Sequence, residues 1–177
     1  MGTWVKLLGY FTKRLTAIIF VIVVLIMATF IAYDCANIYV ILEEGMALRA
    51  DAVLSDAEST LLDKFFTQSF LNSDKLLNSG QYEDFDISSY DYKVKIKKVW
   101  AWPWRKNAEA TIQEIVFDIY GKPKNAEQDE KREGEESPPP VFIPRWENGE
   151  KLVNLKKVNH RWIIDKVTIV RSLDEFD

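Results

Sequence analysis

The chain has 177 residues, which is enough for one domain with accessory segments but not for two full domains. Its formal net charge of -4 argues against nucleic acid as the main partner, because phosphate binding needs a basic face. One cysteine excludes an intramolecular disulfide, and one histidine leaves too few ligands for the usual zinc sites. We therefore expect no cofactor.

Residues 15–33 form an uncharged apolar run, LTAIIFVIVVLIMATFIAY. An α-helix of that length reaches about 28 Å, close to the roughly 30 Å of a bilayer's hydrocarbon core. The alternative is the core helix of a soluble protein, but such helices are usually shorter and carry a polar stripe. The run therefore predicts a transmembrane helix over residues 15–33.

The flanking charges predict the orientation of this helix. Those before it are all basic: Lys6, Lys13 and Arg14. Those that follow are acidic: Asp34, Glu43 and Glu44. Because basic residues stay on the cytoplasmic side, residues 1–14 are expected to be a cytoplasmic tail of a cell-membrane protein, with the C-terminal part outside.

A cleaved signal peptide is the competing interpretation of the same segment. We favour an uncleaved signal anchor, because the run is longer than a usual signal core and no small-x-small cleavage site follows it. Tyr33 and Asp34 before Cys35 fit a lipoprotein signal poorly. Acylation of Cys35, a link between two chains through it, and a purely structural role all stay open.

Residues 34–54 have helical periodicity and are expected to be a juxtamembrane helix or stalk. Gly45 is a weak point in it. The apolar face consists of Ile38, Ile41, Leu42, Gly45, Met46 and Ala52.

Ser55 and Glu58 form a capping box that predicts the start of a second helix. This helix carries a wide, core-facing apolar stripe of Leu61, Leu62, Phe65, Phe66, Ser69 and Phe70. A short helical piece at residues 74–78 follows, and Ser79-Gly80 ends it.

The period changes to two at Ile87, which predicts a strand. Its apolar positions are Tyr90, Tyr92, Val94 and Ile96, and they alternate with Lys93, Lys95 and Lys97. Such a lysine row is either a solvated face that discourages edge-to-edge pairing or a contact surface.

Three tryptophans follow at alternate positions, Trp100, Trp102 and Trp104. Alternation places them on one side if the strand persists, whereas Pro103 limits the strand to an edge or an end. They either cap the open end of the core, or contact carbohydrate, a protein partner or lipid headgroups. Together with Lys93, Lys95 and Lys97 they are the candidate interaction surface.

Residues 108–120 form a further strand, with a bulge or bend expected at Gln113-Glu114, where the apolar parity changes. Residues 121–140 are polar and are expected to be a flexible acidic loop ending in three prolines. A short strand is predicted at 141–146. A turn at 147–150 contains Asn-Gly, which suits positive φ.

The last segment predicts a hairpin of residues 151–158 and 161–170 around Asn159-His160, with His160 a solvated turn residue. Its sequence, LKKVNHRWIIDKVTIV, resembles the closing hairpin of the nuclear transport factor 2-like (cystatin-like cone) superfamily. There a turn precedes W-x-I-x-x-V, matched by Trp162, Ile164 and Val167.

Two other parts of the chain support the same resemblance, which covers residues 55–173. LLDKFFTQSF is similar to the superfamily's first helix, and residues 93–104 with 108–120 resemble its long bent strands. The resemblance implies an α+β fold, a cone of helices packed on a curved antiparallel sheet outside the cytoplasm. With one membrane anchor, it is similar to scaffold components of type IV secretion and conjugation machines, and to small anchored Gram-positive proteins.

The first functional hypothesis is a membrane-anchored, non-catalytic scaffold of the bacterial envelope that contacts the bilayer and self-associates or binds other envelope proteins. It predicts that the three tryptophans are exposed together. The second is a domain that binds a small apolar ligand or a cell-wall fragment in a closed pocket. An enzyme is not expected, because the superfamily's acid–base groups are missing, although one buried carboxylate such as Asp63 or Asp118 would reopen that possibility.

Overall fold

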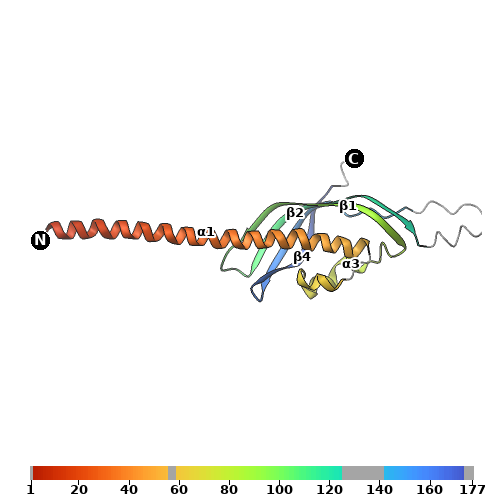
Figure 1. The fold of residues 1–177 in the computed structure, drawn as a ribbon, viewed down its shortest axis with the longest axis horizontal. Helices are drawn as coiled ribbons and strands as arrows, with labels where there is room; N and C mark the ends of the chain where they lie inside the picture. Colours follow the sequence, from red (N-terminus) through yellow and green to blue (C-terminus); the bar gives the residue numbers. More distant parts are fainter. Residues whose placement is uncertain (1, 56–58, 125–141, 174–177) are drawn as a thin grey trace, which may run out of the picture.

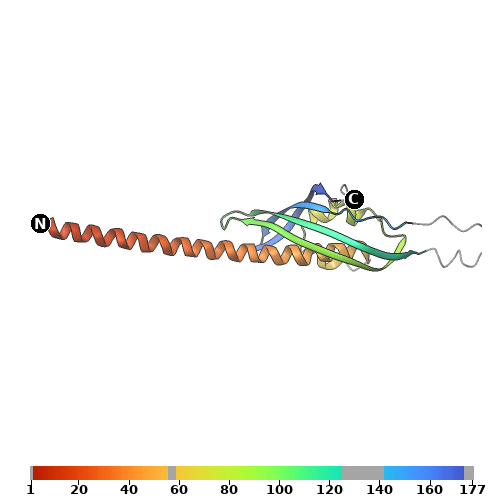
Figure 2. The same cartoon turned by 90° about the horizontal axis from the view of Figure 1, so that it is seen from above.

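The computed structural model describes residues 2–55, 59–124 and 142–173, and it has an α+β fold. One long helix and several short helical segments lie against one face of a four-stranded antiparallel sheet (Figure 1). The strands bend over the helix, as the view from above also shows (Figure 2). The predicted α+β class with an apolar N-terminal helix is confirmed.

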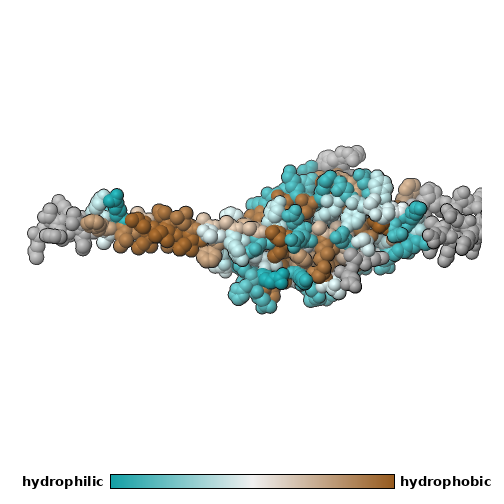
Figure 3. Space-filling view, viewed as in Figure 1, coloured by the Kyte–Doolittle hydropathy of each residue, from teal (hydrophilic) through white to brown (hydrophobic). Residues whose placement is uncertain are grey.

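Helix α1 comprises Gly2–Leu54 without a break. Its N-terminal half projects away from the domain, and the apolar side chains of residues 15–26 are exposed around the whole helix. Figure 3 shows them as a hydrophobic band that ends where the domain begins. The helix is long and apolar enough to span a membrane.

The helix predicted over residues 34–54 is present as the C-terminal part of α1. It is the core helix of the domain, so it does not form a stalk. Ile38, Leu42, Met46 and Ala50 are fully buried and recur every four residues, which aligns them on one helix face. The predicted apolar face was right. Because the sheet packs on that face, the domain begins at about Asp34 rather than at Ser55.

The continuous helix predicted from Ser55 is also wrong. The chain instead forms a 3-10 helix η1 (Ser59–Lys64), α2 (Gln68–Ser73) and α3 (Lys75–Asn78), and Glu58 lies outside the described residues. Between η1 and α2 the backbone pairs with the last strand: the Ile164 N–H donates to the Phe65 carbonyl at 2.7 Å, and Thr67 N–H donates to the Ile164 carbonyl at 2.9 Å. This pairing interrupts the helix.

The short helix α3 lies where residues 74–78 predicted it, with Asp74 as its N-cap. The Asp74 side chain accepts the Leu76 N–H at 2.9 Å, satisfying one free donor of the first turn. Beyond its end Gly80 has φ +62, the left-handed conformation that glycine adopts without strain.

The sheet contains β1 (Phe85–Ala101), β2 (Asn107–Pro123), β3 (Gly149–Val158) and β4 (Arg161–Ser172) in the order β1-β2-β3-β4. Each strand is antiparallel to the next. The β3–β4 turn is confirmed: Asn159 and His160 have φ 49 and 64, as a two-residue type I′ turn requires, and His160 is exposed.

The parity change in β2 lies later than predicted. Alternate residues of β2 stay buried through Glu114 to Val116, so no bulge occurs at Gln113-Glu114. The pattern changes at Asp118, whose φ of 49 bends the strand, and the register with β1 shifts there. The apolar residues Ile115 and Phe117 therefore belong to the outer face of the sheet.

Residues 142–148 have no regular secondary structure, so the strand predicted at 141–146 is wrong for the described part, and Val141 lies outside it. The Asn-Gly turn is also wrong, because neither Asn148 nor Gly149 has positive φ. Instead the Asn148 side chain accepts the Val116 N–H at 2.7 Å and donates to the Val116 carbonyl at 3.1 Å. The Asn148 side chain thus makes the two hydrogen bonds to Val116 that a neighbouring strand would otherwise make.

The segment expected as a flexible loop begins later than residue 121, because β2 continues to Pro123. The rest of that prediction, residues 125–140, lies outside the described residues.

Candidate functional site

The three tryptophans lie together at one end of the domain, where the β1–β2 hairpin turns. We call residues 100–106 the tryptophan tip. Trp100 and Trp102 contact edge to face with ring centroids 5.4 Å apart, and Trp102 and Trp104 stack at 4.9 Å. Trp100 is 50% exposed and Trp104 is 64% exposed, whereas Trp102 between them is half-buried. The three rings form a continuous aromatic surface with its two outer rings open to their surroundings.

An irregularity in β1 turns Trp100 outward. Ile96 pairs with Ile112 and Lys98 with Thr111, which leaves Lys97 as an extra residue in β1. Without this bulge, Trp100 would share the inner face of Tyr92, Val94 and Ile96. The bulge places Trp100 on the outer face instead, while the following Ala101 is buried.

The strand itself ends at Ala101, so Trp102 and Trp104 belong to the turn rather than to a continuing strand. The turn is closed by the Arg105 N–H, which donates to the Trp102 carbonyl at 3.0 Å. The prediction that Pro103 marks a strand end is confirmed, and the tryptophans do not cap the core.

The predicted lysines are on the same outer face but farther along β1. Lys93 bonds to Asp91 at 2.8 Å and lies 5.0 Å from the centroid of the Phe117 ring. Lys97 bonds to Glu150 at 2.8 Å, and Lys95 is exposed. These three residues, the lysine row, face outward from an edge strand and do not join the tryptophan tip.

A groove of about 740 Å³ runs beside the tip and is lined by residues of all four strands. Its walls are mixed: Trp100 and Trp102 supply aromatic surface, and Glu109 and Asp165 are acidic. The basic lining residues are Lys98, Arg105, Lys156 and Lys166. An open, polar groove of this kind differs from the enclosed apolar pocket that a small-ligand site needs.

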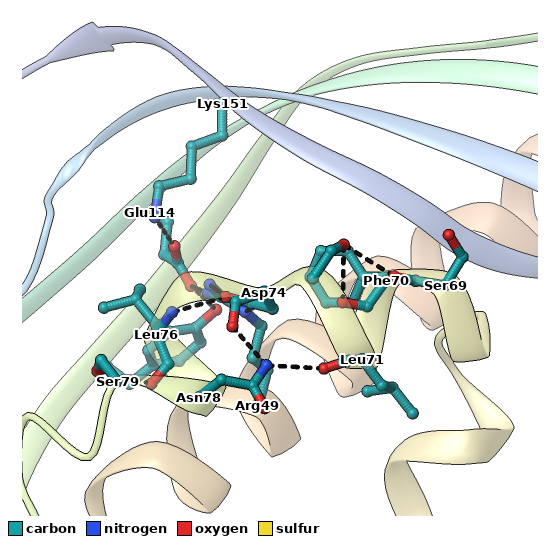
Figure 4. A network of polar contacts seen from close by, with 12 residues as sticks. Arg49, Ser69, Phe70, Leu71, Asp74, Leu76, Asn78, Ser79, Glu114 and Lys151 are labelled. Atoms are coloured by element: carbon teal, nitrogen blue, oxygen red, sulfur yellow. Dashed lines mark hydrogen bonds and ion pairs between the residues drawn. The ribbon is translucent and has the colours of Figure 1, made fainter.

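A buried charge cluster lies beneath the sheet, and sequence reasoning missed it. It consists of Arg49, Asp74, Glu114 and Lys151, all nearly or completely buried (Figure 4). Arg49 binds the Asp74 carboxylate through Nε and through Nη2, the latter at 3.0 Å. Lys151 Nζ binds Glu114 directly, and Arg49 Nη1 lies 3.8 Å from Glu114 Oε1.

The cluster joins four elements, because its members come from α1, the α3 N-cap, β2 and β3. Two cations balance two carboxylates, so the buried charges compensate one another. Burial alone would lower the pKa of Arg49, but the bond to Asp74 and the charge of Glu114 outweigh it and raise that pKa. The cluster is therefore a structural network with both carboxylates engaged.

Tyr92 extends this cluster toward β1. Its hydroxyl donates to Glu114 Oε1 at 3.2 Å. Burial, then the Glu114 charge and this bond, raise the pKa of Tyr92 far above its usual range. Tyr92 is therefore a hydrogen-bond donor here rather than a source of protons.

The carboxylates that sequence analysis named as possible catalytic groups are not part of this buried cluster. Asp63 and Asp118 are exposed, so neither is the buried carboxylate that would reopen the enzyme hypothesis. Glu114 is the fully buried acid, and its signal was the isolated Glu among β-branched residues of β2. Among the described residues, no three His, Cys, Asp or Glu side chains gather as a metal site requires.

Asp34 forms a second buried polar contact at the end of the apolar run. It is 5% exposed, and its carboxylate accepts the Trp162 Nε1–H at 3.0 Å and bonds to Lys157 Nζ at 2.8 Å. Cys35 beside it is half-buried against the core, and the predictions of its acylation or cross-linking stay untested.

Comparison with protein families, curated proteins and solved structures finds no match to the chain. The resemblance to the nuclear transport factor 2-like superfamily therefore stays a prediction.

Proposed function

We propose that the chain is a single-pass, membrane-anchored and non-catalytic interaction module of the bacterial envelope. In this proposal α1 spans the membrane with the basic tail, residues 1–14, in the cytoplasm and the α+β domain outside. The tryptophan tip and the lysine row are its contact surfaces. An assembly of the secretion or conjugation type fits such a scaffold, in line with the resemblance of the sequence.

The exposure of Trp100 and Trp104, with the half-buried Trp102 between them, carries this proposal. Soluble domains rarely leave such a cluster of large aromatic rings open, and tryptophan is enriched where proteins bind partners. Trp100 and Trp104 are at least half exposed, although the domain has a hydrophobic core in which other large side chains are buried. An interaction module was expected to expose all three tryptophans together, and two of the three are exposed.

A binding domain for a small apolar ligand receives less support. The space beneath the sheet, where such a ligand would lie, is filled by Ile38, Leu42 and Met46 of α1. The groove beside the tip is open and carries both charges. A cell-wall fragment stacked on Trp100 and Trp102 is the form of this alternative that the groove favours, because sugar rings stack on aromatic faces.

The test uses the full chain expressed in bacterial membranes, in a Cys35→Ser background. A membrane-impermeant maleimide should label His160→Cys in intact cells but label Thr3→Cys only after lysis. A photo-crosslinking residue at Lys95 should then give adducts with a second copy or with another envelope protein. The same residue at the exposed Gln81, far from both contact surfaces, is the matched control.

The reverse labelling pattern would overturn the topology. Adducts at Lys95 no more frequent than at Gln81 would overturn the lysine row as a contact surface. Binding of soluble peptidoglycan fragments by the purified chain, lost in Trp100→Ala, would favour the alternative function.

A further inference from the structure

We propose that the tryptophan tip rests on the surface of the same bilayer that α1 spans, with its rings among the lipid headgroups and its basic neighbours on anionic lipid phosphates. This inference rests on the proposed membrane anchoring. It names a lipid surface as the partner of the tip and leaves the lysine row as the surface for protein partners.

The tryptophan tip lies close to the point of α1 where the apolar run ends. Asp34 is the first residue after the apolar run, so it marks the membrane surface along the helix. Lys157 Nζ lies 2.8 Å from the Asp34 carboxylate, and the Lys157 N–H donates to the Lys106 carbonyl at 2.7 Å. These two contacts place the end of the β1–β2 turn at the level where the apolar run ends.

The distance along the chain from Lys106 to the tryptophans is short. Trp104 is two residues from Lys106, and two residues of extended chain reach at most about 7 Å. Both hairpin turns of the sheet point toward the N-terminal half of α1 (Figures 1 and 2). The burial stripe of α1 also continues past Asp34 to the half-buried Ile31 and Met27, inside the apolar run. The tip thus lies at the depth of a membrane interface.

The chemistry of the tip suits that depth. Tryptophan is enriched at membrane–water interfaces, because its large apolar ring enters the acyl boundary while its N–H stays among headgroups. Trp100, Trp102 and Trp104 touch one another in sequence, so they present one aromatic surface rather than three mobile rings. Among the described residues, the domain has no other cluster of exposed tryptophans.

The charge around the tip is complementary to anionic lipid. The two turns, residues 102–106 and 156–161, contain no acidic residue, although the whole chain has a net charge of -4. They contribute Arg105, Lys106, Lys156, Lys157 and Arg161. Among the described residues no ion pair joins Arg105, Lys106 or Arg161 to a carboxylate. Basic clusters next to a membrane helix bind anionic headgroups in this way.

A protein partner for the tip is the competing occupant. Such a partner would have to enter between the domain and the bilayer, because the Asp34–Lys157 contact holds the tip beside the end of the anchor. The lysine row, in contrast, faces sideways along β1 and is open to a neighbouring protein. The geometry therefore favours lipid for the tip.

The experiment measures tryptophan fluorescence of the full chain in nanodiscs of anionic lipid brominated either near the headgroup or near the methyl end of the acyl chain. A Trp4→Phe background removes the tryptophan on the other membrane side. Bromine near the headgroup should quench the emission more strongly. A variant with Trp100, Trp102 and Trp104 changed to Ser should lose most of this difference, whereas changing Lys93, Lys95 and Lys97 to Gln should not.

The charge contribution has its own variant. Changing Arg105, Lys106 and Arg161 to Gln should reduce the quenching in anionic nanodiscs to the level seen in zwitterionic ones. The buried Trp146 and Trp162 report folding, since an emission shift to the red in any variant would reveal an opened core.

Two results separate failure of this inference from failure of the anchoring. If the chain enters nanodiscs but headgroup bromine quenches the variant with Trp100, Trp102 and Trp104 changed to Ser as much as the unchanged chain, the tip does not touch lipid and the inference is overturned while the anchor stands. If the chain does not co-purify with nanodiscs, the anchoring fails and the inference fails with it.

Discussion

The ammonium of Lys157 lies 2.8 Å from the carboxylate of Asp34, 123 residues earlier in the chain. The contact joins the β3–β4 hairpin to the point of α1 where the apolar run ends. Because α1 continues without a break into the core, the apolar run and the core helix of the domain are parts of one helix. The orientation of the sheet relative to the apolar run follows from this helix and this ion pair.

Loss of the Asp34 carboxylate should destabilise the domain. Asp34→Ala leaves Lys157 and the buried Trp162 N–H without their acceptor, and we expect a loss of about 2–3 kcal/mol in the free energy of unfolding. Urea unfolding of the full chain in detergent measures it. Asp91→Ala, which breaks the exposed pair with Lys93, should cost about 0.5 kcal/mol or less. Equal losses in the two variants would contradict a structural role for Asp34.

The buried charge cluster predicts a larger effect for Glu114. Glu114→Gln removes the counter-charge of Lys151 and weakens that of Arg49, so the free energy of unfolding should fall by about 3–5 kcal/mol. The exposed Glu109→Gln on the same strand is the control and should be nearly neutral. Combining Glu114→Leu with Lys151→Met should recover much of the loss, since both buried charges then disappear together. Urea unfolding measures these differences. A double variant less stable than Glu114→Gln would contradict the prediction.

Alkaline pH should weaken the fold through its buried tyrosines. Burial raises the pKa of Tyr82 from 10.0 to about 12, and burial with the Asp51 bond raises that of Tyr90 as well. A raised pKa in the folded state means that the unfolded chain loses its proton first. The stability contribution is therefore full below pH 10 and is lost as the pH rises toward 12.

The variant Tyr82→Phe isolates one of these protons. Between pH 10 and 12 it should flatten the fall of stability by at most about 1.4 kcal/mol per pH unit, as urea unfolding at several pH values would measure. At neutral pH it should cost little, because the Tyr82 hydroxyl is buried without a hydrogen-bond partner in the described part of the chain. Tyr120→Phe, at an exposed ring, is the control. An unchanged slope in Tyr82→Phe would refute the assignment.

Gly45 should resist substitution although it lies in a helix. An added Cβ would lie 3.0 Å from the Cβ of Phe65 and 3.3 Å from Ile164 Cδ1, which is tighter than ordinary packing. Gly45→Val should therefore destabilise the domain by about 1–3 kcal/mol through overpacking. Ala36→Val makes a similar change at an exposed position of the same helix and should cost less than about 1 kcal/mol. Thermal unfolding followed by circular dichroism compares the two.

The elements with strong local patterns were predictable from the sequence. Nineteen uncharged residues allow little besides a membrane-length helix, and the Asn159-His160 pair between two apolar runs specifies a tight hairpin. The short helix predicted at residues 74–78, with Ser79-Gly80 at its end, is also present as α3. The local pattern was misleading where a segment pairs with a distant strand instead of forming its own helical hydrogen bonds. Phe65 to Thr67 read as helix, but they pair with Ile164, a hundred residues away.

The candidate site was only partly readable from the sequence. Trp100, Trp102 and Trp104 were recognisable as a group, but their exposure depends on one extra residue, Lys97, in the pairing of β1 with β2. A bulge reverses every side chain after it, and nothing in the local sequence marks where the partner strand will leave a residue unpaired.

Local sequence patterns specify the kinds of element in this protein: an apolar helix of membrane length, alternating strands and a closing hairpin. These follow from periods and turn residues that act within a few positions. Long-range packing set which charges are buried together, which face the tryptophans occupy and how close their tip lies to the end of the apolar run. Those features depend on contacts such as Lys151 with Glu114 and Lys157 with Asp34, which exist only after segments far apart in the chain have packed.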